Sequence, residues 1–322
     1  MIKTQRITNE PMVTAGIIVI FFVLILFILY PIFSVLRLSL TPDGRFSFEV
    51  YRSLFAHPRY FGAIGNSVML GAIVATLATA LGFMFAFAVS RAAIPGKKFF
   101  QTMAILPIIS PPFMFALSVI LLFGRNGLIT GHLLGLDVRT IYGLRGLVLV
   151  QTVNLFPLAY LTLSGILQGI DPDLETSAMN LGASRWRAFR TVTLPLAAPG
   201  IFAAWMVVFV SSMTDFGNPI IIGGDFNVLS VQAYLEFTGM GNLPRGAALA
   251  ILLLVPTVAV YFVQKNLLGH HSYATITGKS SRRSAAQATP TAKRLLFIAC
   301  SAVTLLVFLF YGTIIFGSFV KL

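Results

Sequence analysis

The chain reads Ile17-Ile-Val-Ile-Phe-Phe-Val-Leu-Ile-Leu-Phe-Ile-Leu29 near its start, an unbroken run of apolar residues. A transmembrane β-strand would alternate apolar and polar residues, because one face meets lipid and the other faces the lumen. This run is apolar on every side, and with its flanks it reaches the roughly 20 residues that a helix needs to cross a bilayer. It therefore predicts a transmembrane helix and argues against a transmembrane β-barrel.

The same apolar pattern recurs along the whole chain. Of its 322 residues, 57% are hydrophobic and only 10% are charged, which is too little polar surface to cover a soluble globule. The first run also exceeds the ~7 to 15 apolar residues of a secretory signal, so we expect it to be retained as a helix. The predicted fold class is all-α, a polytopic transmembrane helical bundle with spans near residues 12–36, 62–90, 99–123, 143–169, 196–222, 245–268 and 295–320.

The net charge of +13 is distributed unevenly about these spans. With a cytoplasmic N-terminus, fourteen of the 23 basic residues fall on the inner side, as the positive-inside rule requires. This topology places the loop between the fourth and fifth spans in the cytoplasm. Contact with anionic membrane lipid accounts for the excess of positive charge better than nucleic-acid binding does, so we expect lipid contact and no nucleic-acid partner.

A basic stretch of linker composition, Gly278-Lys-Ser-Ser-Arg-Arg-Ser-Ala-Ala-Gln-Ala-Thr-Pro290, follows the sixth span. We therefore expect a six-helix unit over residues 1–269, a basic cytoplasmic linker over 270–294 and the first helix of a truncated second unit over 295–322. The segment Leu26-Phe-Ile-Leu-Tyr30 aligns with Val307-Phe-Leu-Phe-Tyr311. This similarity is what a repeat of the same unit would produce. Two unrelated apolar helices of similar composition explain the likeness equally well.

Helix-breaking residues collect in two of the predicted spans. Pro107, Pro111 and Pro112 lie in the third span, and Asn154 and Pro157 lie in the fourth. Such residues free backbone groups that must be satisfied inside the protein or by water in a cavity. These spans are therefore candidates to line a path across the membrane, and an ordinary packed kink is the equal alternative.

Asp215 is the one acidic residue well inside a hydrophobic segment. A carboxylate inside a membrane is costly, so by default it indicates a function. It belongs to Thr214-Asp-Phe-Gly-Asn-Pro219, near the outer end of the fifth span. Asn154, Asp215 and Asn218 are thus candidates for a substrate path, while a cap on a broken helix turn is the alternative role of Asp215.

The chain offers no constellation of residues typical of an enzyme or a metal site. Its four histidines, His57, His132, His270 and His271, lack the spacing of a metal-binding pair. Gly278-Lys-Ser280 lacks the earlier glycine of a phosphate loop, so we expect the ATP site to lie on another chain. Since no nucleophile, base and metal ligands cluster in the sequence, we expect neither an enzyme nor a cofactor.

A polar stretch of mixed charge, residues 171–195, separates the fourth and fifth spans. Asp171-Pro-Asp-Leu-Glu175 suits the first turn of a short helix, because proline and acidic residues are favourable there. Gly182 then allows a turn that other residues resist. Arginines and aromatic residues follow, at Arg185, Trp186, Arg187, Phe189 and Arg190. A loop resting on lipid headgroups would explain the arginines but not the acidic helix, so we expect docking to another protein.

The spacing from Gly182 to Val192-Thr-Leu194-Pro195, after a short acidic helix, resembles the EAA loop of inner-membrane permeases of binding-protein-dependent ABC importers. The family signature is Glu-Ala-Ala, three residues, glycine, nine residues and Ile-x-Leu-Pro. On Gly182 the triad falls at Thr176, Ser177 and Ala178, so only the last alanine matches, and Glu175 stands one position before it. The resemblance implies an ATPase-coupling loop that includes Glu175, Thr176, Ala178, Gly182, Val192, Leu194 and Pro195.

The first six spans are similar to the ferric-iron permease branch of that family, whose members often join two six-helix units in one chain. The likeness rests on Phe123-Gly124-Arg-Asn-Gly127, Asp215-Phe-Gly-Asn-Pro219, Gly223-Gly-Asp-Phe-Asn227 and Ser272-Tyr-Ala-Thr-Ile-Thr-Gly278-Lys279. It implies a bacterial inner-membrane transporter in which a second permease unit, a periplasmic substrate-binding protein and a cytoplasmic ABC ATPase dimer act with this one. Ferric iron is the implied solute, and 2-aminoethylphosphonate, polyamines and thiamine are the alternatives.

An ion-coupled secondary carrier that works without an ATPase is the rival from another class. Such carriers build their sites from broken helices and polar groups near the middle of the membrane. This chain supplies few buried polar groups for that purpose, and ATP-dependent uptake would remove the rival.

Overall fold

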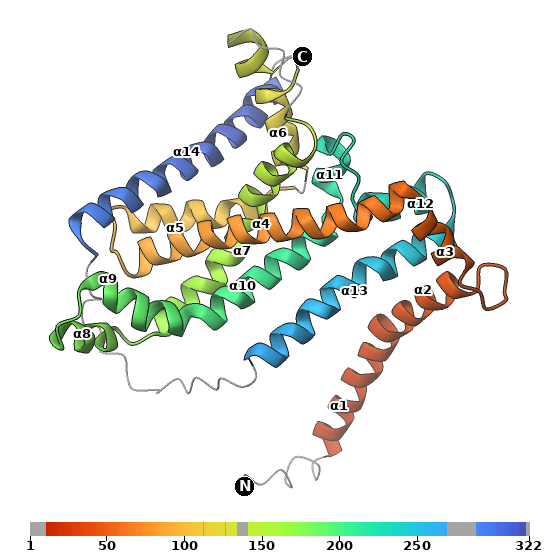
Figure 1. Ribbon diagram of the computed structural model, residues 1–322, viewed down its shortest axis with the longest axis horizontal. Coiled ribbons are helices and arrows are strands. Elements are labelled where there is room, and N and C mark those ends of the chain that lie inside the picture. Colours follow the sequence, from red (N-terminus) through yellow and green to blue (C-terminus); the bar gives the residue numbers. More distant parts are fainter. Residues whose placement is uncertain (1–10, 112, 126, 134–140, 269–287, 320–322) are drawn as a thin grey trace.

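The computed structural model describes residues 11–111, 113–125, 127–133, 141–268 and 288–319 (Figure 1). All regular structure in these residues is helical, so the predicted all-α class is confirmed. Seven of the described helices are long and apolar enough to cross a membrane: Met12–Leu40, Pro58–Ser90, Met114–Gly131, Leu144–Gly169, Arg185–Thr214, Leu243–Asn266 and Pro290–Phe319.

Short helices and breaks divide these spans into smaller elements. The first span consists of α1 (Pro11–Leu24), the π-helical turn η2 (Ile25–Leu29) and α2 (Tyr30–Leu40). The remaining elements, in chain order, are α3 (Glu49–Ala56), α4 (Pro58–Ser90), α5 (Lys97–Ile105), η3 (Leu106–Ile109), α6 (Met114–Phe123), η4 (Leu128–Leu133), α7 (Leu144–Gly169), α8 (Pro172–Asn180), α9 (Arg185–Ala188), η5 (Phe189–Thr193), α10 (Leu194–Thr214), α11 (Gly217–Ile222), α12 (Leu229–Thr238), α13 (Leu243–Leu268) and α14 (Pro290–Phe319).

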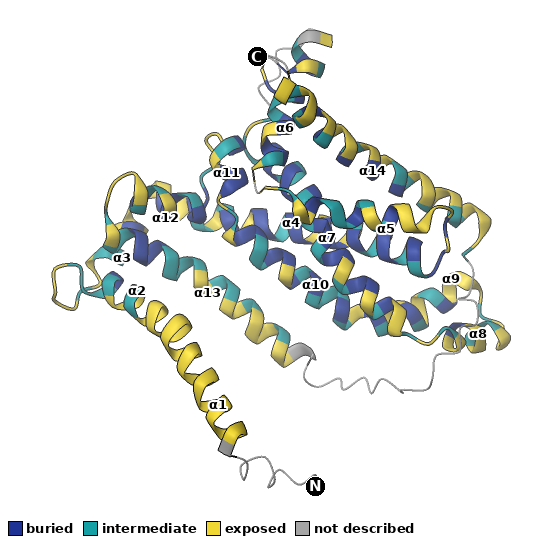
Figure 2. Cartoon of the chain, turned by 180° about the vertical axis from the view of Figure 1, so that it is seen from behind, coloured by how far each residue is buried: buried dark blue, intermediate teal, exposed yellow. Residues whose placement is uncertain are grey.

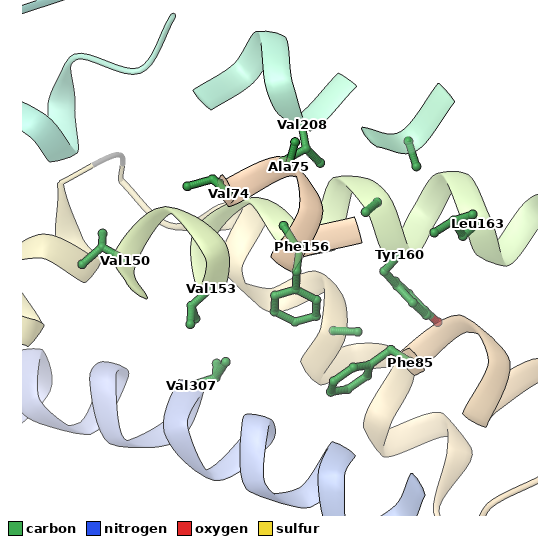
Figure 3. Close-up of a cluster of buried hydrophobic side chains, with 14 of the residues drawn as sticks. Val74, Ala75, Phe85, Val150, Val153, Phe156, Tyr160, Leu163, Val208 and Val307 are labelled. Carbon is green, nitrogen blue, oxygen red and sulfur yellow. The ribbon is translucent and has the colours of Figure 1, made fainter. Parts of the chain in front are cut away.

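The core forms where α4, α7 and α10 lie side by side at the centre of the bundle (Figure 2). The ring of Phe85 in α4 lies 5.3 Å from that of Phe156 and 6.5 Å from that of Tyr160, both in α7 (Figure 3). The two helices approach closely at Gly82, where an added Cβ would lie 2.7 Å from the Cβ of Ala159. In lipid, such close packing of small residues is a main source of helix association, because the surroundings are as apolar as the side chains.

The predicted span near residues 99–123 is interrupted at its prolines. The chain forms α5 and η3, turns at Ser110 and resumes as α6 at Met114. Ser110 is extended (φ −75°, ψ 143°), because the ring of the following Pro111 disfavours the helical region for the residue before it. The span that can cross the membrane is therefore Met114–Gly131, later in the chain than expected.

The predicted span over residues 196–222 is also divided. α10 ends at Thr214, the extended Asp215 follows (φ −67°, ψ 118°), and α11 begins at Gly217. Because α10 starts at Leu194, its 21 residues are enough to cross the hydrocarbon without α11.

The last helix begins earlier than its composition indicates. α14 starts at Pro290, inside the stretch predicted as linker, of which residues 288 and 289 are also described. The earlier part of the predicted linker, including His270 and His271, lies outside the described residues.

α14 and α1 have opposite environments in this chain. α14 packs against α4, α5 and α6, and the ring of Phe310 lies 5.8 Å from that of Phe115 in α6. The hydroxyl of Tyr311 donates to the carbonyl of Leu106 at 2.9 Å, so α14 satisfies a backbone group beside the proline break. By contrast, every side chain from residue 12 to residue 30 is exposed (Figure 2).

Candidate functional site at one end of the bundle

The polar loop, residues 171–195, lies at one end of the bundle, opposite the end that carries α3 and α12 (Figure 1). Asp171 caps α8, since its side chain accepts a hydrogen bond from the backbone N–H of Asp173 at 2.9 Å. Pro172 occupies the first turn, where its missing N–H costs no helical hydrogen bond. The short helix therefore begins where the sequence predicts, with acidic residues near the positive end of its dipole.

Gly182 turns the chain after α8. Its φ of +91° lies in the region that side-chain-bearing L-residues rarely adopt. Its N–H donates to the carbonyl of Met179 at 2.9 Å, and the N–H of Ala183 donates to that of Ala178 at 3.0 Å. Because a Cβ on Gly182 would meet nothing within 4 Å, the requirement for glycine comes from the backbone and not from crowding.

The returning half of the polar loop rests on α4. Ser184 caps α9 by accepting from the N–H of Arg187 at 3.2 Å. The ring of Phe189 lies 5.5 Å from that of Trp186 and 5.3 Å from that of Phe87 in α4. These contacts hold the loop against the transmembrane core.

The residues that the family signature assigns to the loop differ in exposure. Glu175 is buried, Ala178 and Val192 are half-buried, and the others are exposed, namely Thr176, Gly182, Leu194 and Pro195. The hydroxyl of Thr176, at the position of the family glutamate, donates to the carbonyl of Pro172 at 3.2 Å. The buried carboxylate of this loop is therefore that of Glu175, which points into the protein.

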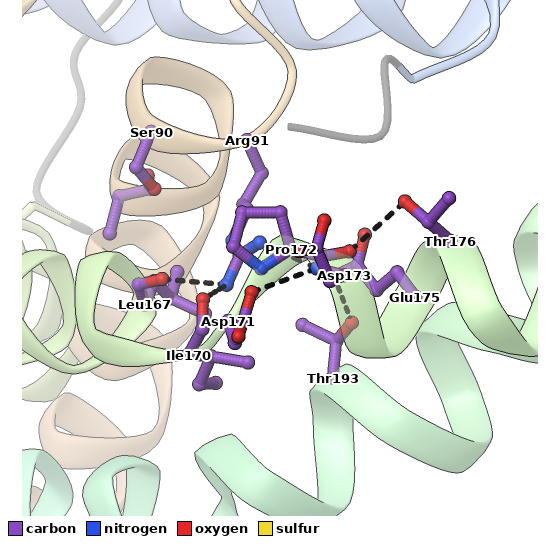
Figure 4. A network of polar contacts seen from close by, with 11 residues as sticks. Ser90, Arg91, Leu167, Ile170, Asp171, Pro172, Asp173, Glu175, Thr176 and Thr193 are labelled. Atoms are coloured by element: carbon purple, nitrogen blue, oxygen red, sulfur yellow. Dashed lines mark hydrogen bonds and ion pairs between the residues drawn. The ribbon is translucent and has the colours of Figure 1, made fainter. Parts of the chain in front are cut away.

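Glu175 belongs to a buried polar network at the base of α8 (Figure 4). Its Oε1 lies 3.7 Å from NH1 of Arg91 and accepts a hydrogen bond from the hydroxyl of Thr193. The NH2 group of Arg91 donates to the carbonyls of Leu167 at 2.8 Å and Ile170 at 2.5 Å. The network joins the end of α4, the end of α7, α8 and the residue before α10.

Sequence reasoning did not identify Arg91 or Thr193 as part of the site. Arg91 stands directly after a predicted span, and there it reads as one more cytoplasmic charge for topology. Its 3% exposure separates it from the other described basic residues of that side, and burial depends on long-range packing. The sequence signal for this pair was a basic residue at the end of a span, Arg91, and an acidic residue in the polar loop, Glu175.

The outward side of the polar loop is apolar at its tip. Leu181 is 90% exposed, Trp186 is 68% exposed and Leu174 is 47% exposed. Single exposed apolar residues are ordinary on protein surfaces, but three on one short hairpin form a surface suited to a partner.

The second predicted group, around Asp215, lies where α10 ends. The Asp215 carboxylate accepts from Nε2 of Gln151 at 2.9 Å, and from the backbone N–H and Nδ2 of Asn218 at 3.2 and 2.8 Å. Ser212 donates to Oε1 of Gln151 at 2.6 Å, and Ser230 donates to the backbone carbonyl of Asp215 at 2.7 Å. The carboxylate therefore ties α7 to the break between α10 and α11.

The remaining candidates are placed as follows. Asn218 is fully buried, with its Oδ1 lacking a hydrogen-bond partner, and Asn154 is half-buried on α7. Gln151, which completes the group, was not singled out from the sequence. Among the described residues, no three histidine, cysteine, aspartate or glutamate side chains are grouped to hold a metal ion.

Several transport permeases are similar to this chain over most of its length. The ferric transport system permease protein FbpB of Actinobacillus pleuropneumoniae is 28% identical over 98% of this chain and 47% of its own length. A putative ferric transport system permease FbpB 1 of Haemophilus influenzae is 28% identical over 98% and 51%. The chain thus spans about half the length of these two relatives. The trehalose transport system permease SugB of Mycobacterium tuberculosis is 30% identical over 78% of this chain and 93% of its own length.

The fold also has solved counterparts. A bacterial ABC transporter involved in the import of the polysaccharide alginate matches with a TM-score of 0.70 at 17% identity, over 81% of this chain and 96% of that one. Residues 78–269, which include the polar loop and the Asp215 group, match the family model of the binding-protein-dependent transport system inner membrane component. The resemblance expected from Gly182 and Leu194-Pro195 is confirmed, and the chain belongs to this family of binding-protein-dependent transport permeases.

Proposed function

We propose that the chain is a permease unit of an ATP-driven importer, and that its polar loop docks on an ATPase subunit. The form of the loop carries the proposal: its inner side is held by Phe189 on Phe87 of α4 and by the bond from Thr193 to Glu175, and its outer side exposes Leu181 and Trp186. Exposed aromatic and apolar side chains on a firm support are typical of protein interfaces. An anchored loop also moves with its partner, so it can bias the helices toward the state that the partner prefers.

The complete transporter in this proposal contains a second permease unit, a cytoplasmic ABC ATPase dimer and a periplasmic substrate-binding protein. The description of the family, which makes transport dependent on a binding protein, supports the last of these. The chain itself carries out no catalysis in this scheme, because ATP is hydrolysed by the ATPase subunits.

The end of the bundle that holds the polar loop is cytoplasmic in this proposal, as is the N-terminus, and the membrane is the bacterial inner membrane. Basic residues at the corresponding helix ends support the orientation: Lys97 and Lys98 begin α5, Lys265 lies in the last turn of α13, and Lys293 and Arg294 lie near the start of α14. Such residues favour the cytoplasmic side.

Ferric iron is the proposed solute, because the two relatives that match nearly the whole chain are named as ferric transport permeases. Shorter matches carry other names, including a molybdenum transport permease of Escherichia coli that is 33% identical over 59% of this chain. 2-Aminoethylphosphonate, polyamines and thiamine remain the alternatives. Uptake assays with each solute and its binding protein would distinguish them.

A second permease unit is proposed as the partner of α1, with 270–294 as the linker between the units. α14 packs on α4, α5 and α6 of this unit, whereas residues 12–30 contact no other part of it closely enough to be buried. If α14 is the first helix of a second unit, that first helix packs on this unit. By the same arrangement, α1, the first helix of this unit, would pack on the second unit. The alignment of Tyr30 with Tyr311 supports this exchange, because Tyr311 bonds to the proline break of this unit.

Asn154, Asp215 and Asn218 are proposed to border the substrate path near its outer end. Within this group we assign Asp215 the role of a cap that holds the helix break, since three hydrogen bonds already occupy its carboxylate. Its function would then be to keep α7 and α11 in register beside the path.

The test is uptake by the complete transporter in proteoliposomes, with its ATPase and binding protein, and with or without ATP. Gly182→Val should lower uptake severalfold without lowering the amount of inserted permease, because valine at φ +91° costs about 1–2 kcal/mol and distorts the loop. Gly169→Val is the matched control, since that exposed glycine also has nothing within 4 Å of its Cβ position but no positive φ.

Two outcomes would contradict the proposal. Unchanged uptake by Gly182→Val, with ATPase association also unchanged, would count against a coupling role for the loop. Uptake that an ion gradient drives without ATP would establish the secondary carrier instead.

A further inference from the structure

Arg91 occupies a position where three helices meet below the membrane core. It directly follows α4, is 3% exposed, and its NH2 group caps the end of α7 through the carbonyls of Leu167 and Ile170. The last carbonyls of a helix have no partner inside it, and a cation there also interacts favourably with the helix dipole. Arg91 thus joins α4 and α7 into one body at this end (Figure 4).

The other terminal nitrogen of Arg91 has no hydrogen bond. NH1 is buried, and its nearest anionic group is Oε1 of Glu175 at 3.7 Å. Burial lowers the pKa of Arg91, and the Glu175 and Asp171 carboxylates oppose that shift. Because a guanidinium stays protonated in proteins, the buried positive charge depends on this carboxylate for its partner.

Glu175 Oε1 is at the same time the acceptor for Thr193, which precedes α10. The carboxylate of α8 is therefore bonded toward α10 and only loosely paired with α4 and α7. Shortening the distance to NH1 from 3.7 Å to the 2.7–2.9 Å of a charge-assisted hydrogen bond needs a movement of about 1 Å. The structure holds this carboxylate on Thr193, with the unbonded NH1 of Arg91 within reach of such a movement.

We propose that Arg91 is a positioning residue that transmits movement of α8 to α4 and α7, an inference that rests on the proposed coupling function. Closure of the ATPase moves α8, the carboxylate exchanges Thr193 for the free NH1 donor, and α4 and α7 follow as one body. Coupling requires an element with two arrangements that the partner biases, and this network supplies one. Lysine should replace Arg91 only in part, because an ammonium keeps the positive charge but does not offer the planar fork that reaches two carbonyls and a carboxylate together.

The test compares Arg91→Met, Arg91→Lys and Lys98→Met in the complete transporter, reconstituted with its ATPase and binding protein. Lys98 is the matched control, because it is an exposed cation near the same end whose side chain is outside the network. The measured quantity is solute taken up per ATP hydrolysed, together with the amount of assembled transporter. We expect this ratio to fall at least tenfold in Arg91→Met and severalfold in Arg91→Lys, and to stay at the wild-type value in Lys98→Met.

Thr193→Val supplies a second measurement if Arg91→Met fails to assemble. It removes the competing donor, so the carboxylate should move to Arg91, and ATP hydrolysis without the binding protein should rise. The contrary result is that, in both Arg91 variants, uptake and ATP hydrolysis fall in proportion to the amount of assembled protein, so that solute taken up per ATP hydrolysed stays at the wild-type value. That result would show that Arg91 is merely structural and would overturn the inference. Absence of ATP-dependent uptake in the wild type would instead overturn the proposed function.

Discussion

Gly82 offers a sharp test of how the core holds together. An alanine Cβ there would lie 2.7 Å from the Cβ of Ala159 and 2.7 Å from the backbone nitrogen of Tyr160. Carbon atoms pack best at about 3.5–4.0 Å, so α4 and α7 would have to separate by roughly 1 Å at this point. The backbone carbonyl carbon of Ala159 would also lie 2.9 Å away. Since two of these three atoms belong to the backbone of α7, no side-chain rotation can relieve the contact.

The cost of Gly82→Ala follows from that separation. Overpacking of this kind costs about 1–3 kcal/mol, and a gap of 0.5–1 Å elsewhere along the two helices loses a quarter to a half of the dispersion energy there. Alanine in place of glycine inside a helix gains about 0.5–1 kcal/mol, which offsets part of the cost. Gly65→Ala is the matched control, because Gly65 lies in the same helix with nothing within 4 Å of its Cβ position. The helix-propensity gain cancels between the two variants, so their difference measures the overpacking alone.

Cys300 provides the assay, since it is the single cysteine of the chain and is fully buried. A thiol-reactive dye added during heating in lipid nanodiscs labels Cys300 only when α14 leaves the core. We expect labelling of Gly82→Ala at a clearly lower temperature than wild type, and of Gly65→Ala at the wild-type temperature or slightly above it. Equal labelling temperatures for the two variants would refute the argument that the α4–α7 approach limits side-chain size.

Three further changes test other parts of the structure. Asp215→Ala should destabilise the protein by about 1–3 kcal/mol, because it leaves buried amide donors without an acceptor. The Cys300 labelling assay measures this loss, and an equal loss in the exposed control Asp225→Ala would contradict the prediction. Tyr311→Phe should speed Cys300 labelling, because the Leu106 carbonyl loses its donor at a cost of about 1–3 kcal/mol; an unchanged rate would show that this bond does not hold α14. Leu181→Asp should weaken binding of the ATPase to the permease about tenfold or more, since it places a charge on a residue that is 90% exposed at the tip of the polar loop. Affinity is measured with purified components, and an unchanged value would show that Leu181 lies outside the interface.

The helix breaks show how far sequence reasoning reaches in this fold. Pro107 and Pro111 indicated an irregular third span, and a cap on a broken helix turn was one of the two roles expected for Asp215 in the fifth. Pro111 accounts locally for the extended Ser110, but the contacts that hold each break could not be predicted, because a distant group donates to the backbone there. Tyr311 supplies that group for the first break and Ser230 for the second, and neither lies near the break in sequence.

The candidate site divides in the same way. Gly182 and Leu194-Pro195 could be placed from the sequence, because a left-handed turn and a helix start are local requirements of the backbone. Arg91 and Gln151 could not, since their roles come from partners 84 and 64 residues away, as the pairs Arg91–Glu175 and Gln151–Asp215 show.

The sequence by itself determined that this protein is a bundle of membrane-spanning helices with a polar loop between two of them. Lipid offers no hydrogen bonds, so every long apolar run must satisfy its own backbone as a helix, and hydrophobicity alone reveals where such runs occur. Only the tertiary structure decided that the Glu175 carboxylate points inward between Arg91 and Thr193, and that α14 is packed while α1 is exposed. Those outcomes depend on which helices meet and at which residues, and contacts between distant parts of a chain are established by packing, not by local pattern.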